Sequence, residues 1–366
     1  MALRASTETE IAEAVRGANG PMRIVGGGSR AIGRVVTAEV LETSGLSGVR
    51  LYEPGALTLV AGAGTPLAEV EMLLANERQR LPFEVPDMRA LLGRTGLSTL
   101  GGVVAANASG PRRVQVGACR DSLIGVRLVD GMGTVIKNGG RVMKNVTGYD
   151  LVKLMAGSFG TLGILTEVSF KVLPMPQAEL TLMFHGLDDG RAIAAMSAAL
   201  SSPFEVSGAA HLPGVGTFLR LEGFSASVAY RAGQLAAVLS DFGPATKDED
   251  SPKRWKDIRD VASFQQQAGD VWRVSVKPSD APRLVSKAGA AAVTYDWGGG
   301  LIWLLMEAGT DLRARLGQYG GHATRIRAGQ ADGIPAFQPE APALTSLAKG
   351  LRAKFDPRGI FNPGLM

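Results

Sequence analysis

Short apolar runs that lead into glycine-rich turns dominate the first half of the chain. Residues 22–25 and 57–61 have the length and apolar character of buried strands, and each ends at such a turn. The second turn opens a helix, for which we predict Thr65 as N-cap and Pro66 at the first helical position. A third glycine-rich stretch covers residues 93–110. Glycine stands where tight turns and close backbone approaches need a residue without a Cβ atom.

The next elements follow the same periodicity rules. The pattern predicts an N-terminal helix after Thr7, with Glu10 completing a capping box. It also predicts a β-hairpin over 121–130 and 134–137, a short helix over 149–156 and then a strand. Apolar and polar positions alternate in that strand, so one face should hold Ile164, Val168, Phe170 and Val172.

Residues 177–340 show a different order of elements. A strand–helix–strand–strand–helix series occurs twice, on either side of the charged stretch 247–260. Two such rounds predict an antiparallel sheet with helices packed on one face. We therefore expect an α+β fold in three parts, over residues 1–176, 177–340 and 341–366. The last part should begin with an amphipathic helix whose apolar stripe is Leu344, Leu347, Leu351 and Phe355.

Composition and charge exclude several classes of protein. Lys and Arg exceed Asp and Glu by only five charges and form no basic run, which argues against a nucleic-acid partner. No apolar run approaches the roughly 18 residues that span a bilayer, and the N-terminus lacks a signal-peptide core, so we expect a cytoplasmic protein. The single cysteine, Cys119, excludes an internal disulfide, a cysteine-ligated zinc site and an iron–sulfur cluster held by this chain alone.

Several glycine-rich loops in one domain favour a site for a diphosphate. Glycine lets backbone N–H groups approach a polyanion, and Arg30 or Arg94 could add a charge-assisted hydrogen bond. Each loop taken singly is also compatible with an ordinary turn. No P-loop motif occurs, and a dinucleotide-binding fingerprint at Gly62 fails because its third glycine position holds Leu67.

Taken together, the loops resemble a known family. The runs Thr99–Gly110, Asp121–Gly131 and Gly148–Glu167 are similar to the FAD-binding domain of the vanillyl-alcohol oxidase/p-cresol methylhydroxylase (PCMH-type) flavoproteins. Within that superfamily, Ser109–Arg113 (SGPRR) and Val142–Leu151 (VMKNVTGYDL) resemble the E subunits of bacterial glycolate oxidase (glycolate dehydrogenase). The resemblance implies a PCMH-type FAD-binding domain with two α/β subdomains, a cap domain, and a C-terminal tail that returns to the FAD domain.

The resemblance also implies which residues hold FAD. The diphosphate would lie on one group of loop residues: Gly26, Gly27, Gly28, Ser29, Arg30, Gly101 and Gly102. The isoalloxazine and ribityl side would be lined by a second group: Thr95, Ser98, Thr99, Ala105 and Asn107. Gly160, Gly163 and Ile164 would contact the adenosine half, and Asn362 would return near the flavin. Relatives with covalent flavin have a histidine where this chain has Ser29, which favours non-covalent FAD.

The candidate substrate residues are fewer. Catalytic relatives that oxidise 2-hydroxy acids carry a metal-binding histidine motif, which this chain lacks, so no metal site is predicted. The three histidines, His185, His211 and His322, are too far apart in sequence to suggest a ligand set. Arg273 is a candidate for binding a substrate carboxylate, with pairing to Asp260 as the alternative, and Arg259 is a second candidate.

The resemblance implies an FAD-binding subunit of a complex that oxidises glycolate, or a similar small 2-hydroxy acid, to the oxo acid. Onward electron transfer would need a partner with iron–sulfur centres, and the implied partners are the sister D subunit, which also binds FAD, and the iron–sulfur F subunit. Such a complex could lie peripherally on the membrane. Two alternatives stay open: an FAD-binding subunit that assembles the complex or relays electrons without turnover, and a stand-alone FAD-dependent alcohol or sugar-acid oxidase.

Overall fold

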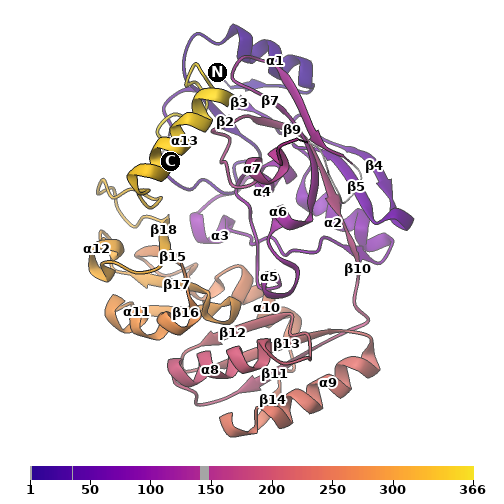
Figure 1. The fold of residues 1–366 in the computed structure, drawn as a ribbon, viewed down its shortest axis with the longest axis vertical. Coiled ribbons are helices and arrows are strands. Elements are labelled where there is room, and N and C mark those ends of the chain that lie inside the picture. Colours follow the sequence, from indigo (N-terminus) through magenta and orange to yellow (C-terminus); the bar gives the residue numbers. More distant parts are fainter. Residues whose placement is uncertain (1, 35, 141–147) are drawn as a thin grey trace.

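The computed structural model describes residues 2–34, 36–140 and 148–366. Its fold is α+β, with an N-terminal half of three sheets, of three, two and five strands, and a second half built on one large sheet (Figure 1). Residues 142–147 of the predicted Val142–Leu151 motif lie outside the described residues. The division at residues 176 and 340 stays a prediction.

The chain begins with a three-stranded parallel sheet and one helix. Its strands, in spatial order, are β1 (Leu3–Arg4), β3 (Glu39–Glu42) and β2 (Met22–Val25). Helix α1 (Glu8–Gly17) starts at Thr7, whose side chain accepts a hydrogen bond from the N–H of Glu10, as predicted. The C-terminal tail joins this sheet, because the backbone N–H groups of Met22 and Asn362 bond to Ile360 and Met22, respectively.

A five-stranded antiparallel sheet forms the centre of the N-terminal half. Its spatial order is β4 (Val49–Glu53), β5 (Thr58–Gly62), β9 (Ile164–Lys171), β7 (Leu123–Val129) and β8 (Val135–Gly139). The predicted face of β9 is wrong at one position. A register shift against β7 puts Leu165 in the core with Val168 and Phe170, while Ile164 packs into the other cluster beside Ile11.

Helices close the N-terminal half around this sheet. Helix α2 (Leu67–Asn76) buries Leu67, Val70 and Leu74, which share one face of the helix, and Pro66 is its N-cap. The Thr65 hydroxyl instead donates to the carbonyl of Gly62 at 2.7 Å, so the predicted Thr65 cap is wrong. The remaining elements of this half are short: η1 (Pro54–Ala56), β6 (Gln79–Arg80), α3 (Arg89–Leu92), α4 (Leu100–Ala105), α5 (Arg113–Val116), α6 (Cys119–Ser122), α7 (Leu151–Met155) and β10 (Leu173–Pro174).

The second half is an eight-stranded antiparallel sheet with an internal repeat. The spatial order is β14 (Ala245–Lys247), β11 (Ala178–Phe184), β13 (Gly216–Gly223), β12 (Gly208–Leu212), β16 (Ala292–Asp296), β17 (Leu301–Met306), β15 (Asp270–Val276) and β18 (Gly321–Arg327). Each round of the predicted series gains one edge strand, β14 or β18, that sequence analysis did not predict. The two resulting βαββαβ units meet where His211 pairs with Tyr295.

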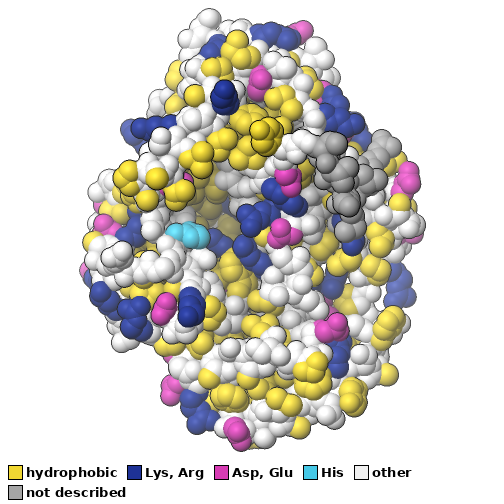
Figure 2. All heavy atoms as spheres, viewed as in Figure 1, with side chains coloured by type: hydrophobic (Ala, Val, Ile, Leu, Met, Phe, Trp, Pro, Cys, Tyr) yellow, Lys and Arg dark blue, Asp and Glu magenta, His cyan; other side chains and the backbone are white. Residues whose placement is uncertain are grey.

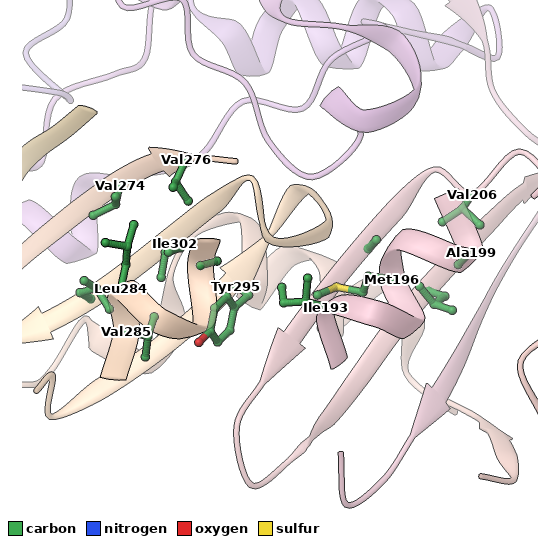
Figure 3. Packing of buried hydrophobic residues seen from close by; sticks show 14 of the residues in the cluster. Ile193, Met196, Ala199, Val206, Val274, Val276, Leu284, Val285, Tyr295 and Ile302 are labelled. Carbon is green, nitrogen blue, oxygen red and sulfur yellow. The ribbon is translucent and has the colours of Figure 1, made fainter. Parts of the chain in front are cut away.

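The repeat helices cover one face of the large sheet. They are α8 (Asp189–Leu200), α9 (Ser225–Val238), α11 (Ala281–Ala288) and α12 (Leu312–Leu316). Their apolar side chains form one core with the strands, in which Ile193 and Met196 lie beside Tyr295 and the second unit (Figure 3). An unpredicted helix, α10 (Ser251–Arg259), packs on the opposite face through Trp255 and Ile258. Short 3-10 turns join the elements: η2 (Ser240–Phe242), η3 (Ala262–Phe264), η4 (Pro278–Asp280) and η5 (Trp297–Gly299).

The C-terminal helix α13 (Pro342–Phe355) lies along the N-terminal half (Figure 1). Its apolar stripe is less buried than its amphipathic pattern suggests, with Leu344 57% and Leu347 63% exposed. The helix is anchored at its end, where Phe355 packs on the core and Asp356 accepts hydrogen bonds from the next turn.

A partly buried charge network joins the two halves. Arg220 on β13 bonds to Glu84 at 2.8 Å, and Arg112 bonds to Glu222 on β13 at 2.9 Å. Burial alone would raise the pKa of Glu84, but the guanidinium groups of Arg220 and Arg112 outweigh that effect and lower it to about 2. These ion pairs fix the sheet against the N-terminal half.

Candidate functional site

The first cavity lies where the glycine-rich turns meet, and its volume is about 380 Å³. It is lined by residues that the chain brings from four separate segments. These are Gly26, Gly27, Gly28, Ser29 and Arg30 after β2, then Thr99, Gly101, Gly102 and Ala105 around α4, then Gly160, Gly163 and Ile164 leading into β9, and Asn362 from the tail. All of these residues are among the predicted cofactor residues.

Glycine is required at the floor of this first cavity. A Cβ atom on Gly27 would lie 1.8 Å from the carbonyl oxygen of Leu97, and one on Gly96 would lie 1.8 Å from the carbonyl oxygen of Gly27. The two loops therefore pack backbone against backbone. Gly28 has φ +72°, a left-handed conformation that favours glycine.

The lining offers free hydrogen-bond donors. Among the described residues, the backbone N–H groups of residues 26–30 donate to no protein acceptor. The side chain of Asn362 ties the cavity wall together, because it accepts from the N–H of Ile24 at 2.8 Å and donates to the carbonyl of Phe159 at 2.9 Å. A row of unpaired N–H groups without side chains in the way is a site for an anionic group such as a diphosphate.

Three predicted cofactor residues lie elsewhere. Thr95 and Ser98 do not line the first cavity; the carbonyl of Ser98 instead accepts a hydrogen bond from Leu67 at 2.8 Å. Asn107 lines the second cavity, and its side-chain oxygen accepts from the N–H of Arg120. The linear motif placed these residues near the site but did not fix which way each one faces.

The second cavity, of about 640 Å³, lies between the N-terminal half and the large sheet. Its sheet wall comes from cross-strand neighbours. Arg273 on β15 pairs with Thr324 on β18, and two residues further Ser275 pairs with His322. All four line the cavity, because side chains two residues apart on a strand point to the same face. Figure 2 shows basic side chains and a histidine around this hollow beside α13.

Two arginines share one aromatic ring in this second cavity. The guanidinium carbons of Arg113 and Arg273 lie 4.4 and 5.1 Å from the ring centroid of Trp297. Neither side chain forms an ion pair or a hydrogen bond with another described residue. Burial and, after it, the charge of Arg113 lower the pKa of Arg273 to about 10. The wall therefore carries two positive charges without an ion-pair partner, while Glu340 contributes a negative charge to the same lining.

His322 and Trp297 are site residues that sequence analysis missed. Burial and then the charges of Arg273 and Arg113 lower the pKa of His322, so its imidazole is neutral at pH 7. It lies on β18, a strand that was not predicted, so no pattern placed it beside Arg273. Trp297 holds φ 54° and donates its indole N–H to the carbonyl of Gly110 at 3.0 Å, which fixes the ring.

The second arginine candidate does not reach either cavity. Arg259 bonds to Asp260 through two contacts of 2.8 and 2.9 Å and lines neither cavity. The expectation of a catalytic Arg259 is therefore not supported by its position. The same contacts correct the alternative for Arg273, because Asp260 pairs with Arg259 instead.

The two cavities meet. Arg30, Ile32, Ala106 and Phe159 line both of them. Arg30 donates to the carbonyl of Pro86 at 2.7 Å, and burial lowers its pKa. A ligand that fills the first cavity therefore presents one end to the arginines of the second.

Similarity to known proteins decides the family. The chain is 37% identical over 349 residues to glycolate oxidase subunit GlcE of Escherichia coli (strain K12), and the match covers 94% of this chain and 92% of that protein. The chain belongs to the GlcE family. The family model "FAD binding domain" matches residues 1–139. Glycolate oxidase subunit GlcD of Bacillus subtilis (strain 168) is 35% identical over 145 residues, but that match covers only 27% of its length.

The fold of this GlcE-family chain also has solved counterparts. A structure of alkyldihydroxyacetonephosphate synthase superposes with a TM-score of 0.72 at 17% identity, covering 98% of this chain and 76% of that one. This likeness supports the PCMH-type fold. Together with the matched FAD-binding domain, it confirms the predicted resemblance, and the chain is an FAD-linked oxidoreductase relative with FAD as its cofactor. In the described part of the chain, no helix is long and apolar enough to span a bilayer.

Proposed function

We propose that this GlcE-family chain is the FAD-binding subunit of a dehydrogenase complex in which it oxidises a small 2-hydroxy acid, with glycolate as the first candidate. The observation that carries the proposal is the junction of the two cavities at Arg30, Ile32, Ala106 and Phe159. A cofactor in the glycine-lined cavity would present its reactive end to an anion held in the arginine-lined cavity. Oxidation of a carboxylate-bearing alcohol needs that arrangement.

The first cavity would hold FAD non-covalently. The N–H groups of residues 26–30, with Gly101 and Gly102, would bind the diphosphate, and Asn362 would keep the wall closed. Gly160, Gly163 and Ile164 would contact the adenosine half, while Thr99 and Ala105 would line the flavin side. Ser29 offers no nucleophile of the histidine kind for a covalent flavin bond.

The second cavity would bind and orient the substrate. FAD, when bound, supplies the acceptor for a hydride. Arg273 would bind the substrate carboxylate through a charge-assisted pair, which fixes the neighbouring carbon relative to the junction. The hydroxyl proton also needs an acceptor, and His322 is the neutral imidazole on the same wall.

Electrons would leave through partner subunits. The only cysteine, Cys119, is buried, and one thiol cannot hold an iron–sulfur cluster. We therefore propose a partner with iron–sulfur centres, the F subunit, beside the sister FAD-binding chain, the D subunit, in a complex that could lie peripherally on the membrane. Membership of the GlcE family and similarity to GlcD support a multi-subunit assembly.

The test is anaerobic addition of glycolate, and of D-lactate, to the chain purified alone and in the complex with which it is isolated. We expect the flavin absorbance bands to bleach in at least one sample. Arg273→Ala should slow bleaching about 100-fold, since truncating one partner of a buried charge pair costs roughly 2–5 kcal/mol. Arg283→Ala, which removes an exposed arginine outside the cavities, should change the rate less than about threefold.

Two outcomes would contradict the proposal. Flavin that persists with both acids in both samples would leave an assembly or electron-relay role without turnover. Equal rates for the Arg273→Ala variant and the unmodified chain would show that the carboxylate is held elsewhere.

A further inference from the structure

We propose that the second cavity selects a 2-hydroxy acid with a second anionic group, which Arg113 binds while Arg273 binds the carboxylate next to the hydroxyl. The inference rests on the proposed function in that the ligand is a 2-hydroxy acid, and it replaces glycolate, which has one carboxylate, with a longer acid that carries two anionic groups. It adds a substrate class and a specificity-determining residue, Arg113, which sequence analysis did not single out.

The geometry supplies two separate cationic arms. Arg113 comes from the start of α5 in the N-terminal half, and Arg273 from β15 in the large sheet. Both guanidinium groups lie against the ring of Trp297, at 4.4 and 5.1 Å from its centroid, so one small molecule can reach both. The ring is held by its bond to Gly110, which keeps the spacing of the two arms fixed.

No carboxylate of the described residues forms an ion pair with either arginine, although Glu340 lines the same cavity and the charges of Asp296 and Asp121 act on Arg273 and Arg113, respectively. The described residues give neither arginine an ion-pair partner, and the remaining residues, 1, 35 and 141–147, include no Asp or Glu. On the cavity side of the sheet, Arg220 pairs with Glu84. Arg30 at the junction of the cavities resembles Arg113 and Arg273 instead, because it forms no ion pair with a described residue and donates to the carbonyl of Pro86.

The electrostatics favour two negative charges over one. Burial lowers the pKa of both Arg113 and Arg273. The charge of Arg113 lowers the pKa of Arg273 further, and the charge of Arg120 does the same to Arg113. The positive charges of Arg273 and Arg113 also lower the pKa of His322. A monoanion compensates the charge of one arginine and leaves the second arginine, which is half-buried, without a partner. A dianion compensates both charges.

The lining of the second cavity also suits a carbon chain longer than that of glycolate. Apolar lining from Met88, Trp303 and Ile326 would contact the methylene groups between the two anionic ends.

The experiment measures binding without turnover. Isothermal titration calorimetry of the full chain, or of its complex, would compare glutarate with pentanoate, two five-carbon acids that differ in one carboxylate. We expect glutarate to bind at least about tenfold more tightly. Arg113→Gln should remove that preference and leave pentanoate affinity unchanged, and Arg113→Lys should restore part of it. Arg273→Gln should weaken both acids.

A matched control removes a positive charge elsewhere. Arg283→Gln, at an exposed arginine of α11, should leave the preference intact if it arises in the cavity and not from net charge. Equal affinity for the two acids, or a glutarate preference that survives Arg113→Gln, would overturn the inference. Because calorimetry needs neither flavin reduction nor a hydroxyl group, this result is independent of whether a 2-hydroxy acid bleaches the flavin.

Discussion

The two cavities of this protein are built from different materials. The first is lined by backbone, and its shape depends on glycines whose loops touch without side chains between them. The second is lined by side chains, and its character depends on arginines, a histidine and a tryptophan that belong to strands and loops far apart in sequence.

They also differ in how they are assembled. The first cavity uses residues of the N-terminal half and the tail that pairs with β2. The second lies between the large sheet and the N-terminal half, which the pairs of Arg220 with Glu84 and of Arg112 with Glu222 help to hold together. A cofactor site of this kind can therefore persist when the substrate site is lost. The following predictions separate the two.

The largest effect is expected from Gly27→Ala. Its Cβ atom would lie 1.8 Å from the carbonyl oxygen of Leu97, so the loops that form the first cavity must separate. We expect purified Gly27→Ala protein to lose most of its FAD, measured as the ratio of flavin absorbance to protein absorbance.

Gly20→Ala is the matched control, because nothing lies within 4 Å of its added Cβ atom. This variant should keep its flavin. If Gly27→Ala also retained full FAD, the contact between the two loops would not be what shapes the cofactor site.

The first cavity could be predicted from sequence because its signal is local. Each glycine motif is contiguous, and its neighbours in the chain become its neighbours in space, so 13 of the predicted positions line the cavity. Orientation within a motif was harder to predict. The backbone carbonyl of Ser98 accepts from Leu67 of α2, one residue before the N-cap at Thr99, and Asn107, with φ 45°, lines the second cavity.

The second cavity could be predicted only at Arg273. Its other members depend on strand register and on an edge strand, β18, whose sequence carries too weak an alternation to be recognised. Arg113 and Trp297 meet across more than 180 positions of sequence, which no periodicity encodes. The stripe of α13 shows the converse, because an amphipathic pattern predicted the helix but not that Leu344 and Leu347 are exposed.

A smaller effect is expected from Arg220→Met, which removes the ion pair of Arg220 with Glu84 between the two halves. It leaves Glu84 partly buried with one partner fewer, a change that costs roughly 3–5 kcal/mol of unfolding free energy in comparable networks. Urea unfolding would measure this loss. Calorimetry should show weakened acid binding in the second cavity, while the flavin absorbance ratio stays near that of the unmodified chain.

Arg283→Met provides the control for Arg220→Met, because its partner Asp280 is 3.9 Å away at the surface and the change should cost less than about 1 kcal/mol. An Arg220→Met variant that lost flavin and acid binding in parallel would show that the two cavities are not separable in this way.

Low pH should gradually weaken the same ion pairs between the two halves. The pKa of Glu84 is about 2 in the folded protein and near 4.5 in the unfolded chain, so its contribution is fully present above pH 4.5 and is lost as the pH falls toward 2. At roughly 1.4 kcal/mol for each pKa unit, up to about 3 kcal/mol of unfolding free energy is lost in this range.

Thermal unfolding between pH 6 and pH 3 should show a steeper loss of stability for the unmodified chain than for Glu84→Gln, because the glutamine takes up no proton there. Parallel curves would mean that Glu84 does not control the acid response. Divergent curves would show that Glu84 controls the acid response. If the carboxylic-acid ligand is then lost at a higher pH than the flavin, the substrate cavity depends on the ion pairs of Glu84 and the cofactor cavity does not.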